Sequence, residues 1–183
     1  MKKFIAFVLM ACVSLTSQAF DADSDRKEIL ENRDDILSRL YKENPGAKKK
    51  IAKAAGYATF SNIGVNVVFF SAGGGSGVVY DKASGKNTYM SMASAGIGIG
   101  LGVKDFRAVF IFHTKESLTN FVEKGWDFSG QADAAAKSGK KGGEGSVAGT
   151  IVNGVEVYQM TENGIALQAT LQGTKYWKND DLN

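Results

Sequence analysis

The spacing of the hydrophobic residues changes at Tyr57, and this change constrains the fold more than any other feature of the chain. Before Tyr57, apolar residues recur every three or four positions, which is the spacing of amphipathic α-helices. After it, the segments alternate with a period of two and are rich in β-branched and aromatic residues. Helices followed by strands predict an α+β fold, in which N-terminal helices pack on a sheet.

Two helices are predicted before Tyr57. The first covers residues 25–44, with Asp25 and Glu28 resembling a capping box at its start. Its apolar side is formed by Ile29, Leu30, Ile36, Leu37, Leu40 and Tyr41. The second follows Asn44-Pro45, with asparagine as its cap and proline in its first turn, and is expected to end at Gly56.

The strand region predicts a largely antiparallel, strongly twisted sheet, and a barrel-like closure is an open alternative. One helix is inserted at 115–125, with Thr114 as its cap. The glycine-rich stretch "SAGGGSGVVY" is interpreted as a hairpin turn, because no Gly-Lys-Ser/Thr follows it as a phosphate loop requires. Asn153-Gly154 and Asn163-Gly164 predict two tight hairpins and therefore a C-terminal three-stranded meander. Residues 129–146 are interpreted as a loop.

One strand, "SAGIGIGLGV" at 94–103, alternates glycine with large aliphatic residues. Glycine weakens a strand interior, so a bare face needs a reason such as the close approach of another group. A helix, another backbone or a lipid chain would fit against that face. The sequence leaves open whether protein or ligand covers the glycines, which are Gly96, Gly98, Gly100 and Gly102.

The first 19 residues resemble a signal peptide, with a basic start, an apolar run of ten residues and small residues before a cleavage site after Ala19. The apolar run is about half of what a membrane-spanning helix needs. We therefore expect a periplasmic protein whose single domain covers residues 20–183. Cys12 in "LMAC" offers the alternative of a lipoprotein.

The charge balance and composition argue against several classes of function. The 22 Lys and Arg residues fall to 20 once Lys2 and Lys3 leave with the leader, against 19 Asp and Glu, a net charge of +1. This balance does not indicate a nucleic-acid-binding surface. His113 is the single histidine and the mature chain would hold no cysteine, so no transition-metal site, cofactor or enzyme is expected.

The second predicted helix carries a lysine cluster, "AKKKIAK". Wound at 100° per residue, Ala47, Ile51, Ala54 and Ala55 lie opposite Lys49, Lys50 and Lys53, with Lys48 at the border. Such a helix is typical of binding to anionic lipid surfaces. The alternative is a solvated helix whose apolar side packs on the sheet.

Several segments together resemble the SYLF domain, a lipid-binding module found in eukaryotic endocytic and actin-associated proteins and in exported bacterial proteins. These are "AAGYATFSNIG", "AGGGSGVVYD", "GIGIGLGVKD" and "GIALQATLQGTKYWKNDDLN", and the resemblance covers residues 22–183. It departs from the family at Ser61 and at "SGKKGGEG", where the family often has proline and Gly-Pro.

The resemblance implies a non-enzymatic domain that binds anionic phospholipid or a membrane surface through its N-terminal helices and basic residues. Carried over to this chain, the lipid-binding residues are Lys48, Lys49, Lys50 and Lys53. Whether Lys140 and Lys141 join them stays open. The alternative is a structural or envelope-stress protein whose sheet binds a protein partner.

Overall fold

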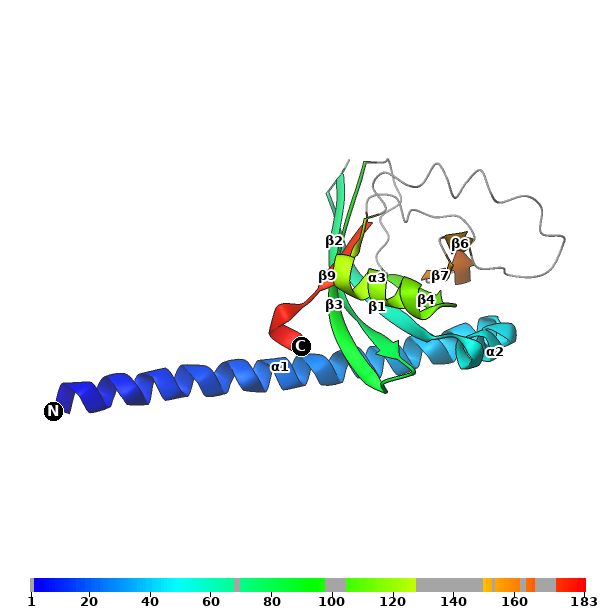
Figure 1. Ribbon diagram of the computed structural model, residues 1–183. Helices are drawn as coiled ribbons and strands as arrows, with labels where there is room; N and C mark the ends of the chain where they lie inside the picture. The colour runs from blue at the N-terminus through cyan, green and yellow to red at the C-terminus, as the bar shows by residue number, and fades with distance from the viewer. Residues whose placement is uncertain are drawn as a thin grey trace.

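The computed structural model describes residues 2–67, 70–97, 105–127, 150–152, 154–161, 164–166 and 174–183. A single long helix, α1 (Lys2–Glu43), runs along one side of the molecule (Figure 1). The predicted capping box is wrong, because Asp25 lies inside α1 and not at its start. The helix continues through this position because no glycine or proline interrupts the chain before Pro45. Ala19 also lies inside α1, and cleavage after it stays a prediction.

The strands form one antiparallel sheet, and the α+β prediction is confirmed. In the described part of the chain, the order across this curled sheet is β5-β9-β3-β2-β1-β4-β7-β6, with β8 also paired to β7. The strands are β1 (Gly56–Val67), β2 (Phe70–Asp81), β3 (Lys86–Ile97), β4 (Asp105–Phe112), β5 (Trp126–Asp127), β6 (Thr150–Val152), β7 (Val155–Thr161), β8 (Gly164–Ala166) and β9 (Thr174–Lys178). A short 3₁₀ helix, η1 (Asp180–Leu182), ends the chain.

The glycine-rich stretch at 71–80 is strand and not the predicted turn. It lies within β2 and pairs with β1 on one side and β3 on the other. Gly77 explains part of this composition, because a Cβ there would collide with the Thr59 carbonyl and the Phe60 ring. At Gly74, in contrast, an added Cβ would meet only open space.

The two predicted C-terminal hairpins are present, since β6 pairs antiparallel with β7 and β7 with β8, and the first turn lies where the sequence predicts it. Gly154, with φ of +77°, lies between Val152 and Val155, which are paired across the predicted turn. The second hairpin is shifted, because Gly164 pairs with Thr161 and belongs to β8. β7 also pairs with β4, which makes it part of the main sheet. The short strands β6 and β8 pair with different parts of β7, so β6, β7 and β8 do not form a separate sheet.

Helices cover both faces of the sheet. On one face, α3 (Lys115–Lys124) packs Leu118 and Phe121 into an aromatic core with Phe60, Phe110 and Tyr176. The predicted Thr114 cap is confirmed, since its side chain accepts a hydrogen bond from the Ser117 amide at 3.1 Å. On the opposite face lie α1 and α2 (Pro45–Lys53), and the predicted apolar side of α1 is buried or half-buried there.

The described part of the alternating glycine strand is Ser94–Ile97, the end of β3. Gly98, Gly100 and Gly102 lie outside the described residues, as do residues 129–146 with Lys140 and Lys141. Among the described residues, no helix is both long enough and apolar enough to cross a membrane.

Candidate functional site: the lysine helix and its buried carboxylate

The lysine helix α2 is docked on the protein by its apolar side. Ala47 is fully buried and Ala54 is 4% exposed, and both join a core formed with residues of α1, β4 and β7. The helix ends at Lys53 and Ala54 is already extended, so Gly56 is not the predicted cap but the first residue of β1. Asn44 precedes the helix as predicted, although its side chain makes no capping hydrogen bond.

The surface beneath α2 is formed by β4 and β7. The buried partners of its alanines there are Val109, Ile111, Tyr158 and Met160. A helix was one of the groups expected against the glycine face of the strand at 94–103, but α2 does not lie on the described part of that strand, which belongs to β3. Because β1 and β2 lie between β3 and β4, α2 covers a different region of the sheet.

The four predicted lipid-binding lysines are exposed, but they have different surroundings. On one flank of α2, Lys48 places its ammonium 5.9 Å from the centre of the Tyr41 ring. On the other flank, Lys50 bonds to the sheet. Lys49 and Lys53 point away from both flanks, and no partner for them is seen within the described residues.

One further lysine reaches α2 from outside the helix. Lys82, in the turn between β2 and β3, donates a short hydrogen bond through its ammonium to the Ala52 carbonyl near the end of α2. A cation is favourable there, because the last carbonyls of a helix carry partial negative charge. We call Lys48, Lys49, Lys53 and Lys82 the lysine surface.

Lys50 belongs to a separate cluster around a buried carboxylate. The Glu156 side chain is 4% exposed, and its Oε1 accepts hydrogen bonds from the Lys50 ammonium at 2.6 Å and the Tyr158 hydroxyl at 2.7 Å. Its Oε2 lies 3.4 Å from Nε2 of His113, just after β4. Lys50 also donates to the Tyr158 hydroxyl at 3.1 Å. We call Glu156, Lys50, His113 and Tyr158 the carboxylate cluster.

The cluster changes the proton affinity of two of its members. The hydrogen bond to Glu156 raises the pKa of Lys50 above 10.5, because the carboxylate stabilises the ammonium form. Burial raises the pKa of Tyr158 above 10, and its hydrogen bond to Glu156 acts in the same direction. At neutral pH, therefore, Lys50 is charged and the Tyr158 hydroxyl keeps the proton that it donates.

The sequence did not indicate Glu156 or Tyr158. In "VEVYQM" they alternate with valines, so both point to the face that α2 covers. If both faces of so apolar a strand are covered, an acidic residue in it needs a cationic partner. Glu156 could therefore have been predicted from the sequence to have such a partner, but the identity of the partner could not. Lys50 is 106 positions away in the chain.

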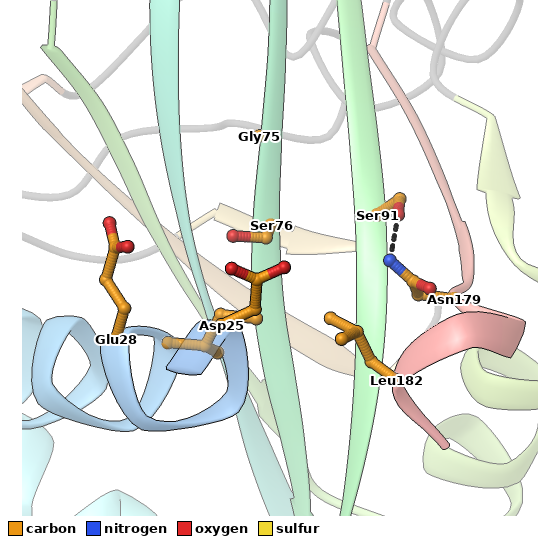
Figure 2. Close-up of a pocket in the computed structure, with 8 residues that line it drawn as sticks. Asp25, Glu28, Gly75, Ser76, Ser91, Asn179 and Leu182 are labelled. Atoms are coloured by element: carbon orange, nitrogen blue, oxygen red, sulfur yellow. Dashed lines mark hydrogen bonds between the residues drawn. The ribbon is translucent and has the colours of Figure 1, made fainter. Parts of the chain in front are cut away.

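A pocket of about 310 Å³ opens elsewhere, between α1, the sheet and the C-terminus (Figure 2). Figure 2 shows the carboxylates of Asp25 and Glu28 along one wall and the Ser91 hydroxyl bonded to the Asn179 amide on another. Two carboxylates repel an anionic headgroup, so this pocket does not suit the lipid class implied by the sequence. No three His, Cys, Asp or Glu residues within the described ranges are grouped to hold a metal ion.

The comparison with known proteins gives a relative but no family. No protein-family model matches the chain. Over 149 residues, or 81% of its length, the chain is 35% identical to beta cell expansion factor A from Aeromonas veronii. The chain spans 55%, about half, of the length of that relative. The name of the relative states neither a ligand nor a reaction, so the function has to be argued from the site.

Proposed function

We propose that this protein is a non-enzymatic, exported domain that attaches to anionic phospholipid surfaces through the lysine surface. The observation that supports it is the docking of α2, which fixes the backbone of the helix while Lys49 and Lys53 extend from its outer side. Fixed cations attract a layer of phosphates without first having to order the chain that carries them. The resemblance to SYLF domains supports the same ligand class.

The docking also defines the mode of attachment. An interfacial amphipathic helix buries its apolar side among lipid chains. In α2 that side is already occupied, since Ala47 and Ala54 are buried against the sheet. We therefore propose electrostatic attachment to headgroups, with no insertion of α2 while it stays docked. Such binding weakens steeply as salt screens the charges.

Co-sedimentation of residues 20–183 with vesicles tests this proposal. Vesicles of phosphatidylcholine alone are compared with vesicles that also contain phosphatidylglycerol, each at low and at high salt. We expect binding to the phosphatidylglycerol vesicles only, and loss of that binding at high salt. Equal binding to both vesicle types, or binding indifferent to salt, would contradict an electrostatic site.

One observation favours a second candidate function, in which the sheet binds a protein partner. Trp177 in β9 is 46% exposed, the only large hydrophobic side chain so exposed among the described residues. It lies opposite Ser91 of β3, whose side chain lines the pocket. An exposed tryptophan is typical of protein interfaces. Unchanged vesicle affinity after neutralisation of the lysine surface would remove the lipid site from α2 and favour this second candidate.

A further inference from the structure

The carboxylate cluster connects the lysine helix to the single histidine of the chain. Glu156 is shared between Lys50 of α2 and His113 of the segment after β4. The two cations approach different oxygens of the same carboxylate, Lys50 at Oε1 and His113 at Oε2. Any change in the charge of His113 therefore acts directly on the group that neutralises Lys50.

His113 is accessible to protons from solvent. Its side chain is 41% exposed, whereas that of Glu156 is 4% exposed. Protonation thus requires no unfolding, and imidazole is the side chain that changes charge between about pH 5 and 8. With neutral His113, the charges of Lys50 and Glu156 cancel; with protonated His113, the cluster carries one net positive charge beside the lysine surface.

The other charged groups on the elements around His113 are of both signs. On the α3 side, Lys115 forms an ion pair of 2.5 Å with Asp81 of β2, and Glu116 lies in the first turn of α3. On the α2 side, Lys53 adds positive charge, and on β7 the Tyr158 hydroxyl stays protonated below pH 10. Within the described residues, Glu156 is the acidic group seen in contact with His113.

We propose that His113 makes lipid attachment pH-dependent, so that acidification strengthens the binding of this domain to anionic membranes. The protonated imidazole competes with Lys50 for Glu156, and one positive charge of the pair is no longer neutralised. The proposal rests on the proposed function, because it assigns a regulator to the same lysine surface. A lysine near an anionic surface contributes about 1 kcal/mol, or about fivefold in affinity, and an imidazolium partly balanced by Glu156 contributes less.

Vesicle binding at two pH values tests the proposal, using untagged protein so that His113 is the only histidine. Wild type and His113→Gln are compared at about pH 7.5 and about pH 5.5, with phosphatidylglycerol vesicles whose phosphodiester stays ionised throughout. We expect wild type to bind about two- to fivefold more tightly at the lower pH and His113→Gln to show no such change. His113→Lys, a permanent cation, should bind tightly at both pH values.

The outcomes separate this inference from the proposed function. One outcome is that wild type prefers phosphatidylglycerol over phosphatidylcholine and yet binds equally at both pH values, as His113→Gln is expected to do. In that case His113 does not regulate binding, and the proposed function of the lysine surface is unaffected. An equal pH response in both variants leads to the same conclusion. If wild type has no preference for the anionic vesicles at either pH, the proposed function fails, and the inference fails with it.

Discussion

Replacement of Lys50 by glutamine should destabilise the protein, although Lys50 lies on an exposed helix. The substitution removes the ammonium that donates to Glu156 at 2.6 Å and leaves a carboxylate whose side chain is 4% exposed. A hydrogen bond to a charged group contributes about 1.5–3 kcal/mol, and breaking a fully buried ion pair costs about 3–5 kcal/mol. The Lys50 side chain is 44% exposed and Tyr158 still donates, so we expect a loss of about 1–2 kcal/mol.

Urea unfolding at neutral pH measures this loss, with Lys49→Gln as the matched control. Lys49→Gln should change the free energy of unfolding by about 0.5 kcal/mol or less, because no partner for Lys49 is seen in the described part of the chain. Lys50→Gln should lower the midpoint by roughly 0.5–1 M at unchanged slope. Equal midpoints for the two variants would refute the idea that Glu156 anchors α2.

The pH dependence of that difference has a definite sign. The folded protein raises the pKa of Lys50 above 10.5, so the stabilisation is fully present below that value. It is lost as the pH rises through the raised pKa. The advantage of wild type over Lys50→Gln should therefore persist at neutral pH and shrink in strongly alkaline solution.

Two further predictions concern the sheet and its turns. Gly77→Ala should destabilise the protein by about 1–3 kcal/mol, because the added Cβ collides with the neighbouring strand. Gly74→Ala places its Cβ in open space and should be neutral or slightly stabilising. Equal urea midpoints for the two variants would show that lack of room for a side chain is not the reason for glycine at position 77. Hydrogen bonds from Lys115 and Ser84 lower the pKa of Asp81 from 3.8 to about 2, so its stabilisation is present above 3.8 and lost as the pH falls toward 2. The stability difference between wild type and Asp81→Asn should shrink over that interval in acid unfolding, and a constant difference would argue against the ion pair.

Local patterns predicted the elements that depend on nearby residues. The apolar side of α1, the Thr114 cap and the lysine side of α2 all follow from residues within a few positions of each other, and the structure has them. The class of fold follows in the same way, since a change of hydrophobic period needs no knowledge of distant contacts.

What the sequence did not reveal depends on contacts between distant segments. The composition of "SAGGGSGVVY" predicts a turn because glycine favours turns. In the structure the stretch is part of β2, and position 77 is a glycine because β1 approaches too closely to leave room for a Cβ. Likewise, Lys50 looked equivalent to Lys49 and Lys53 on a helical wheel. The difference arises because β7 brings Glu156 to one flank of α2. The position of β7 beside α2 depends on its pairing with β4, which the local sequence does not reveal.

If the lysine surface holds the protein on anionic lipid, a charge-matched comparison of variants in the vesicle assay shows it most directly. Lys49→Gln/Lys53→Gln removes the two outward lysines of α2 and keeps the bond of Lys50 to Glu156. Lys124→Gln/Lys178→Gln removes the same charge from the ends of α3 and β9. We predict that the α2 variant loses up to about 2 kcal/mol of binding to phosphatidylglycerol vesicles at low salt, while the control binds nearly as wild type does. Equal loss in both variants would show that only net charge matters, and unchanged binding in the α2 variant would contradict the account.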